Sequence, residues 1–236
     1  MTPPHAVLIT GGAHYLGAAM ALACAGAGMD VAIHYCTEGP DVAETLEAIR
    51  ARGVGATAVA ADLSDPAQVS GIVADAAKAL GRPLTALVNS ASIFEWDDIT
   101  TLTAERILAH YLPNAVAPAL LAQSLLAQLP NGVTGAIVNI LDQDMANQHG
   151  DRMSYTLSRY ALAGLGDMLA RAGAPRLRVN AIAPGFIPAV CEEVRLGVDP
   201  LGKACIHLLE SPVITGQTIH LDAGLRFAGL GRDISF

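Results

Sequence analysis

Residues 6–17 read Ala-Val-Leu-Ile-Thr-Gly-Gly-Ala-His-Tyr-Leu-Gly, and this stretch decides the fold. Its first five residues form a short apolar run that is typical of a buried parallel strand. Two glycines follow, and an alanine-rich stretch from Leu16 to Ala27 predicts a helix. A strand, a glycine turn and a helix in this order open an α/β fold. Taken alone, the loop also fits a plain tight turn between a strand and a helix.

The alternation of strand and helix continues along the chain. Further strands are predicted at 31–35, 57–60, 84–88, 135–140, 177–182 and 218–221, and further helices at 42–52, 66–80, 104–129, 155–172 and 201–209. Such alternation predicts a parallel sheet with helices on both faces. We therefore expect a single α/β domain over residues 1–236, a Rossmann-type doubly wound sheet of about seven strands.

The loop from Thr10 to Gly17 lies where such a sheet binds ligands, at the carboxyl ends of its strands. Glycines there let backbone N–H groups approach a pyrophosphate at the helix N-terminus. The second strand ends at His34-Tyr35-Cys36-Thr37, without the Asp or Glu that would hold a free ribose 2′-hydroxyl. The missing acid favours NADP over NAD, with His14 and His34 as candidate partners of the 2′-phosphate.

Composition narrows the class of protein. The net charge of the 236 residues is -8 and no Lys/Arg run occurs, which argues against a nucleic-acid partner. The four cysteines lack metal or redox spacing, so we predict no metal site and reduced thiols in a cytoplasmic protein. The first residues lack a signal-peptide pattern, and no apolar run of about 18 residues predicts a membrane span.

A tyrosine and a cation stand four residues apart in Tyr155-Thr156-Leu157-Ser158-Arg159. On a helix this spacing puts both side chains on one face, about one turn apart. A guanidinium there favours phenolate, so we expect Arg159 to lower the pKa of Tyr155 and to make it a better proton donor or acceptor. Taken alone, the pair also fits an ordinary surface contact.

Seven short motifs follow one another along the chain: Thr10-Gly11-x-x-x-x-x-Gly17, Asp62-Leu63, Asn89-Ser90-Ala91, Asn114, Tyr155-x-x-x-Arg159, Pro184-Gly185 and Thr215-Gly216-Gln217. In this order, and across nearly the whole chain, they resemble the short-chain dehydrogenase/reductase family. The resemblance implies a dinucleotide cofactor, NADPH. The predicted cofactor-binding residues are Thr10, Gly11, His14, Tyr15, Leu16, Gly17, His34, Tyr35, Asp62, Leu63, Asn89, Ala91, Pro184 and Gly185.

The resemblance also implies individual roles. Asp62 would contact the adenine, Asn89 would support the loop after the fourth strand, and Asn114 would order a water chain beside the catalytic Tyr155. Taken alone, Asp62 also fits a helix N-cap, and Asn114 also fits a solvated polar residue.

Two departures from the common family pattern resemble the pteridine reductases. Tyr15 replaces the usual middle glycine of the first loop, and that branch has a bulky residue at this point. Ser92 replaces another usual glycine, and two residues later comes Phe94, where the branch stacks a Phe ring on the pterin. Ser92 and Phe94 are therefore the predicted substrate-binding residues. The alternative is that Phe94 or Trp96 packs in the core.

A third departure is Asp142, which stands where the family usually has its catalytic Ser. Pteridine reductases similarly have Asp there, thirteen residues before the Tyr, as Asp142 is before Tyr155. In that branch Asp and Tyr together protonate the ring as hydride arrives at carbon. A carboxylic acid suits a ring nitrogen better than a hydroxyl because it can give up a proton. Taken alone, Asp142 or Asp144 also fits a helix or turn cap.

The fourth departure is Arg159, where nearly all members carry Lys. In the family the Lys holds the nicotinamide ribose, lowers the pKa of the Tyr and passes protons along the water chain. An Arg is always charged and has five donors, so it can do the first two, but it carries protons poorly. We expect a slower or more specialised enzyme.

The segment from Phe186 to Pro200, expected to cover the substrate, is short for the family. A short cover implies an open pocket or one that a neighbouring subunit completes. Family members are usually tetramers or dimers packed through their long helices, and the small residues of Leu157 to Ala174 would suit close packing. We therefore expect a homo-oligomer, a tetramer or a dimer.

The predicted function is an NADPH-dependent reductase of a pterin or dihydropteridine, of the dihydromonapterin, dihydrobiopterin or dihydrofolate type. Its predicted catalytic residues are Tyr155, Asp142, Arg159 and Asn114. One alternative is a carbonyl reductase of the 3-oxoacyl type, against which the missing Ser at position 142 counts. The other is a non-catalytic NADP- or pterin-binding protein, which Arg159 favours.

Overall fold

A computed structural model describes residues 5–146, 148–185 and 199–227. Its seven-stranded sheet is built from β1 (Ala6–Ile9), β2 (Asp30–Tyr35), β3 (Ala56–Ala60), β4 (Ala86–Asn89), β5 (Gly135–Ile140), β6 (Leu177–Pro184) and β7 (Thr218–Leu221). The α-helices between them are α1 (Tyr15–Gly26), α2 (Pro40–Arg50), α3 (Pro66–Leu80), α4 (Ala104–Tyr111), α5 (Ala117–Gln128), α6 (Met153–Gly173) and α8 (Asp199–Glu210). The predicted elements all occur, with shifted ends and with one predicted helix, 104–129, divided in two.

All neighbouring strands of the sheet are parallel, in the order β3-β2-β1-β4-β5-β6-β7. The chain builds outward from β1 to β3, returns, and builds outward again from β4 to β7. The order therefore reverses between β1 and β4, and the loops after these two strands diverge there. A crevice at this point is where doubly wound sheets bind their ligands, so the predicted fold class is confirmed.

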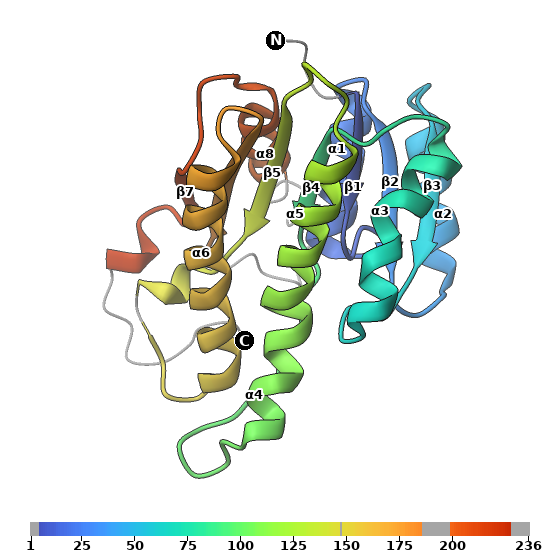
Figure 1. Cartoon of the computed structure of the whole chain (residues 1–236). Helices are drawn as coiled ribbons and strands as arrows, with labels where there is room; N and C mark the ends of the chain where they lie inside the picture. Colours follow the sequence, from blue (N-terminus) through green and yellow to red (C-terminus); the bar gives the residue numbers. More distant parts are fainter. Residues whose placement is uncertain (1–4, 147, 186–198, 228–236) are drawn as a thin grey trace.

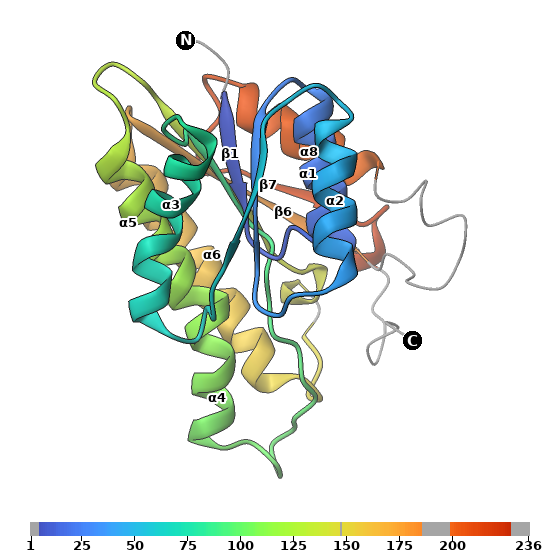
Figure 2. The same cartoon turned by 90° about the vertical axis from the view of Figure 1, so that its right-hand side faces the viewer.

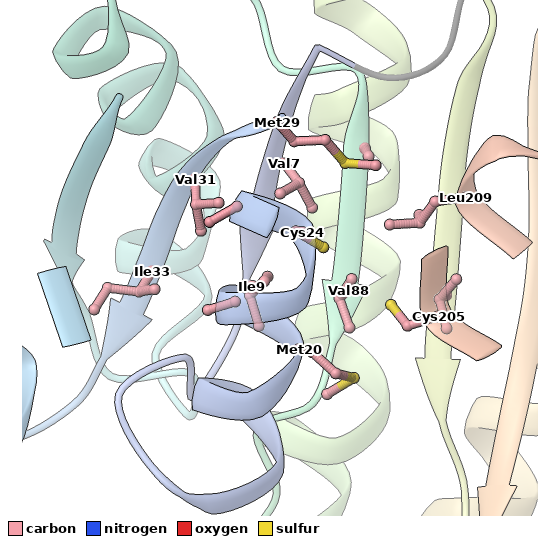
Figure 3. Close-up of a cluster of buried hydrophobic side chains, with 14 of the residues drawn as sticks. Val7, Ile9, Met20, Cys24, Met29, Val31, Ile33, Val88, Cys205 and Leu209 are labelled. Carbon is pink, nitrogen blue, oxygen red and sulfur yellow. The ribbon is translucent and has the colours of Figure 1, made fainter. Parts of the chain in front are cut away.

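Helices cover both faces of the sheet, as Figures 1 and 2 show. On one face α1, α2 and α8 pack over a core of buried strand residues such as Val7, Ile9 and Val88. Figure 3 shows Met20 and Cys24 of α1 and Cys205 of α8 pointing into that core. On the other face α3 and α5 pack over alternate residues of the same strands, among them Leu8 and Leu87. Strands that are apolar on both faces read as continuous hydrophobic runs, which explains Ala6–Ile9.

The predicted helix at 104–129 is interrupted. Between α4 and α5 lies a π-helical turn, Leu112–Val116, which contains Pro113 and the buried Asn114. A proline has no N–H to donate to the preceding turn, so the regular hydrogen-bond ladder is broken at this point. π-helical turns occur frequently at functional sites. This one lies next to the Tyr155 helix α6, against which it packs.

Helix α4 and the first turns of α6 project beyond the carboxyl ends of the strands (Figure 1). Of the segment predicted to cover the substrate, residues 186–198 lie outside the described residues, as does Cys191. No helix in the part of the chain that the structure describes is long and apolar enough to cross a membrane.

Candidate active site

The loop after β1 brings backbone atoms very close together. Gly11 has a φ of 63°, in the left-handed region, and a Cβ on it would stand 3.1 Å from Ala91 Cα. A Cβ on Gly17 would lie 2.0 Å from the carbonyl oxygen of Gly11, and one on Gly12 would lie 2.7 Å from the side chain of Ile33. Only glycine fits these three positions. The loop is therefore shaped by contacts that no side chain allows.

Two buried side chains hold this loop in place. The Thr10 hydroxyl accepts hydrogen bonds from the N–H groups of Ser90 and Ala91, both at 3.0 Å, and so joins the loops after β1 and β4. His34 Nδ1 accepts the N–H of Gly11 at 3.3 Å, and its Nε2 lies 3.0 Å from the Ala61 carbonyl oxygen. Because an N–H can only donate, Nδ1 must be unprotonated and Nε2 must carry the proton.

His34 therefore has neither ring nitrogen available to a phosphate. The prediction that it pairs with a 2′-phosphate is wrong, since both nitrogens are used within the fold. Burial, the largest influence, lowers the pKa of His34 below 6.5, which keeps the ring neutral and able to accept from Gly11. His14 is half exposed at the mouth of the loop and pairs with Asp41 of α2.

A cleft of about 430 Å³ opens beside this loop. Ten of its lining residues were predicted to bind the cofactor: Gly11, His14, Tyr15, Leu16, Gly17, His34, Tyr35, Asp62, Leu63 and Ala91. The others are Cys36, Thr37, Ser90, Ile93 and Pro113, together with the predicted substrate residue Ser92.

The cleft fits a dinucleotide. Helix α1 starts at its edge without a side-chain cap, so the first-turn N–H groups are left for an anion. Tyr15 adopts a φ of 39° and is 83% exposed at the mouth. Positive φ is unusual for a bulky residue and marks the position where a glycine is the common choice. Asp62 lies across the cleft, where hydrogen bonds from Ser64 lower its carboxyl pKa.

Asp62 is not the cap of α3, because Asp65 accepts the Ala67 N–H in that role. Asp62 instead accepts hydrogen bonds from the backbone and hydroxyl of Ser64, which makes a local turn. The helix-cap alternative for Asp62 is therefore wrong. Asp62 lies in the lining of the cleft, and its contact to an adenine stays a prediction.

Tyr155 and Asp142 are brought together as predicted. The Tyr155 hydroxyl donates a hydrogen bond to Asp142 Oδ2 at 2.7 Å, although the residues belong to different elements. The tyrosine is 6% exposed, and burial is the largest influence on it. The pKa of Tyr155 is raised to about 12, because burial and the Asp142 carboxylate outweigh the lowering by Arg159. Arg159 lowers the pKa of Tyr155 as predicted, but burial and Asp142 outweigh it, and the Tyr–Arg spacing carried no information about burial.

Arg159 lies against Tyr155, with its guanidinium carbon 4.9 Å from the ring centroid. Its Nη1 donates to the Ile140 carbonyl oxygen at 3.2 Å. Its buried Nε has no hydrogen-bond partner among the described residues. A buried cation with a spare donor is suited to an acceptor that enters from the cleft, such as a ribose hydroxyl. The alternative that Tyr155 and Arg159 form a surface pair is wrong, because both are buried.

Asn114 lies in the π-helical turn with no exposed surface. Its amide binds the backbone of Ile93 in both directions, accepting at 2.9 Å and donating at 3.0 Å. It also donates to the Ser158 hydroxyl at 2.9 Å. Asn114 therefore joins the loop after β4 to the Tyr155 helix, and the alternative of a solvated side chain is wrong.

The loop after β4 carries two aromatic side chains toward the Tyr155 helix. The Phe94 ring meets Tyr155 edge-on, with centroids 4.9 Å apart, and meets Trp96 edge-on at 5.5 Å. Phe94 is 41% exposed and Trp96 is 39% exposed, so the alternative that they pack in the core is wrong. We call the pair Phe94 and Trp96 the aromatic wall.

Four predicted cofactor residues do not line the cleft. Thr10 supports the loop, and Asn89 donates to Asn139 at 2.8 Å while its own buried Oδ1 has no partner among the described residues. Pro184 ends β6, and Gly185 donates its N–H to the Leu221 carbonyl oxygen at 2.7 Å. The Asn89 bond joins β4 to β5, and its support of the loop after β4 stays a prediction.

Sequence reasoning missed several residues of this region. Arg152, three residues before Tyr155, places its guanidinium carbon 5.1 Å from the Phe94 ring centroid. Arg152 precedes the first residue of α6 and its backbone is not helical, so helical spacing from Tyr155 could not have found it. Asn139, Ser158 and His110 also hold the site, but nothing in their local sequence indicates which distant residues they contact. No group of three or more His, Cys, Asp or Glu side chains within the described ranges could hold a metal ion.

Known proteins resemble the chain over nearly its full length. The family model for short chain dehydrogenases matches residues 5–194. The crystal structure of FolM alternative dihydrofolate reductase 1 from Brucella canis, complexed with NADP, is 33% identical and covers 98% of both chains, with a TM-score of 0.87.

Two curated relatives show the same extent of similarity. An uncharacterized oxidoreductase of Mycobacterium tuberculosis is 32% identical over 94% of this chain and 92% of its own. The 3-oxoacyl-(acyl-carrier-protein) reductase FabG of Staphylococcus aureus is 28% identical over 92% of this chain and 96% of its own. With the parallel sheet, the glycine loop and the buried tyrosine helix, these matches settle the family. The chain belongs to the short-chain dehydrogenase family.

Proposed function

We propose that the protein is an NADPH-dependent reductase of a dihydropteridine, of the dihydromonapterin, dihydrobiopterin or dihydrofolate type. The observation that carries the proposal is the hydrogen bond of 2.7 Å between the Tyr155 hydroxyl and Asp142. It puts a carboxyl group beside the tyrosine, where the family pattern has a serine. The similarity to FolM of Brucella canis supports the same substrate class.

NADPH, when bound, supplies the hydride. The glycine loop and the uncapped first turn of α1 would hold its pyrophosphate, with Asp62 and Leu63 at the adenine. The end of β2 has no acid to repel a 2′-phosphate, since Tyr35, Cys36 and Thr37 line the cleft there. Arg159 would hold a ribose hydroxyl of the cofactor with its Nε, which has no hydrogen-bond partner among the described residues.

Reduction of a ring C=N bond adds a hydride to carbon and a proton to nitrogen, and Tyr155 would hold that proton. Its pKa of about 12 keeps the hydroxyl protonated at neutral pH, so it acts as a donor. Asp142 orients the hydroxyl by accepting its hydrogen bond, so the proton that reaches the ring nitrogen leaves Tyr155. Arg159 would stabilise the phenolate that remains after transfer.

Phe94 would stack on the substrate. Its ring is exposed beside Tyr155, and a flat heteroaromatic ring gains about 0.5–1.5 kcal/mol from aromatic stacking beyond the area that it buries. Ser92, which lines the cleft, would contact the same ligand from the neighbouring turn of the loop.

Reduction of 3-oxoacyl chains is the second candidate, and the FabG relative favours it. A carbonyl oxygen requires a neutral hydroxyl donor beside the tyrosine. Asp142 occupies that place and accepts the hydrogen bond of the Tyr155 hydroxyl, which counts against this candidate. A non-catalytic binding protein is the third candidate, because Arg159 is a poor proton carrier.

NADPH oxidation by the pure protein separates the three candidates. Dihydrobiopterin, dihydromonapterin and dihydrofolate are compared with 3-oxoacyl thioesters and simple ketones. We expect turnover of a dihydropteridine, and robust ketone reduction without pterin turnover would contradict the proposal. NADPH binding without any turnover, together with no gain in Arg159→Lys, would favour the binding protein.

We also propose that copies of the chain associate through α4 and α6. Large apolar side chains are exposed on these two helices: Leu108, Tyr111, Leu157, Tyr160 and Met168. Exposed apolar patches of this kind mark interaction sites. Light scattering after gel filtration should give the mass of a dimer or tetramer, and Leu157→Glu should shift it toward the 24.3 kDa monomer.

A further inference from the structure

We propose that Arg152 is a specificity-determining positioning residue, which holds the aromatic wall of Phe94 and Trp96 in the orientation that accepts a flat bicyclic ring. The inference rests on the proposed function, because it names a residue that selects the substrate of the same site. Arg152 would not touch the reacting atoms, so it acts through the aromatic wall.

The Arg152 guanidinium lies within a group of three rings. Its carbon is 5.1 Å from the Phe94 centroid, 5.5 Å from the Trp96 centroid and 6.0 Å from the Tyr155 centroid. These distances are within the range of cation–π attraction, which is stronger when the cation is withdrawn from water. Arg152 is 3% exposed, so its charge is withdrawn in this way.

Burial separates the two sides of the aromatic wall. Arg152 is almost fully covered, whereas Phe94 and Trp96 keep about two-fifths of their surface exposed, 41% and 39%. The cation is therefore covered, while the rings keep exposed surface. A ligand that stacks on Phe94 would meet a ring that also contacts a buried cation.

Other contacts fix the backbone of this loop but not the Phe94 ring. Asp97 accepts hydrogen bonds from the backbone and hydroxyl of Ser154, and its own N–H donates to the Asp151 carbonyl oxygen.

Three side chains also bind backbone groups of this loop by hydrogen bonds: Asn114 binds Ile93, His110 binds Glu95 and Arg106 binds Trp96. Within the described residues, the Phe94 ring contacts the Arg152 guanidinium and the rings of Trp96 and Tyr155, and its orientation depends on these contacts.

The position of Arg152 in the chain explains why it can do this. It is the residue just before the first turn of α6, and its backbone pairs with that of Asp97. The same residue thus joins the loop after β4 to the helix that carries Tyr155. A change in its side chain would alter the angle between Phe94 and Tyr155 without moving the glycine loop.

The test compares Arg152→Met, which keeps length and apolar bulk but removes the charge, with Arg152→Lys, which keeps a cation. Arg82→Met is the matched control, because Arg82 is a surface arginine paired with Asp30. For each variant we would measure KM and kcat for a dihydropteridine and for a small ketone, and the Kd of NADPH. For Arg152→Met we expect KM for the dihydropteridine to rise about tenfold.

Three further results are expected. The Kd of NADPH changes less than twofold, the KM of any small ketone that is turned over hardly changes, and Arg152→Lys recovers most of the loss. An equal weakening of NADPH and substrate binding would mean a merely structural role and would overturn the inference. An unchanged dihydropteridine KM in Arg152→Met would overturn it as well.

The fluorescence of Trp96 tests the aromatic wall independently of activity. Trp96 is the only tryptophan in the chain, so its emission and its quenching by acrylamide report on the wall alone. Arg152→Met should increase quenching of Trp96, and Arg152→Lys and Arg82→Met should not. Failure of dihydropteridine turnover with this fluorescence pattern would contradict the proposed function only. Unchanged quenching in Arg152→Met would contradict the role of Arg152, whatever the substrate.

Discussion

The glycine loop and the Tyr155 site lie at the same edge of the sheet, but the first is shaped by backbone and the second by side chains. A Cβ at Gly17 would stand 2.0 Å from a backbone oxygen, so backbone contacts leave no choice of residue there. At the other site, Tyr155 meets Asp142 through a hydrogen bond and Phe94 through an aromatic contact.

The difference bears on how each region can vary. Backbone recognition of a pyrophosphate is the same whatever the substrate, because N–H groups at a helix N-terminus bind any phosphate. Side chains around Tyr155 can be exchanged one at a time, as Asp142 and Arg159 illustrate. The two regions should therefore respond separately to substitution. Changes in the loop should alter cofactor binding, and changes around Tyr155 should alter turnover.

The largest effect is expected for Tyr155→Phe. The substitution removes the proton and the bond to Asp142, so kcat should fall by about 10²–10⁴-fold, the range of general acid catalysis. The Kd of NADPH should change by no more than about twofold, which corresponds to about 0.4 kcal/mol of binding free energy. Stopped-flow turnover and fluorescence titration with NADPH measure the two quantities. An unchanged kcat would mean that Tyr155 is not the proton donor.

Gly17→Ala should give the reverse pattern. The added methyl group would displace the Gly11 carbonyl, and overpacking of 1–3 kcal/mol corresponds to about a fivefold to 150-fold rise in the Kd of NADPH. Gly26→Ala is the matched control in the same helix, since nothing lies within 4 Å of its Cβ. Equal NADPH affinity in both variants would refute the account of the loop.

A smaller effect is expected from His34 on acidification. The folded protein lowers the pKa of His34 below 6.5 by burial, so the unfolded chain takes up a proton first as the pH falls. The contribution of neutral His34 to stability is therefore fully present above pH 6.5 and is lost as the pH falls toward the lowered folded value. Urea unfolding between pH 7.5 and 5 should show that the free energy of unfolding falls less steeply with decreasing pH in His34→Gln than in the natural protein. An identical slope in both proteins would contradict the neutral, buried His34.

The backbone-shaped region was the easier one to predict from the sequence. Gly11 and Gly17 after an apolar strand indicate the loop, and the missing acid near Tyr35 indicates the nucleotide preference, because both signals are local. The role of His34 was not predictable in this way. Its partner Gly11 is 23 residues away, and only the pairing of β1 with β2 brings the two together.

Around Tyr155 the sequence indicated which residues form the site, but it did not indicate how deeply they are buried. Asp142 and Tyr155 were predicted to act together by resemblance, and the structure brings them within hydrogen-bond distance. Arg159 lowers the pKa of Tyr155 as predicted, but burial by distant segments, which the local spacing does not indicate, outweighs it and raises the pKa to about 12. The contacts of Arg152 with the aromatic wall depend on the same packing.

Asp142→Ser tests the central claim most directly, because it restores the residue that the family usually has beside the tyrosine. The measurement is the ratio of kcat/KM for a dihydropteridine to that for a 3-oxoacyl thioester, in the natural protein and in the variant. If Asp142 adapts the Tyr155 site to a ring nitrogen, this ratio should fall by about a hundredfold or more, within the range of general acid catalysis. A ratio that stays the same, or that rises, would contradict the account.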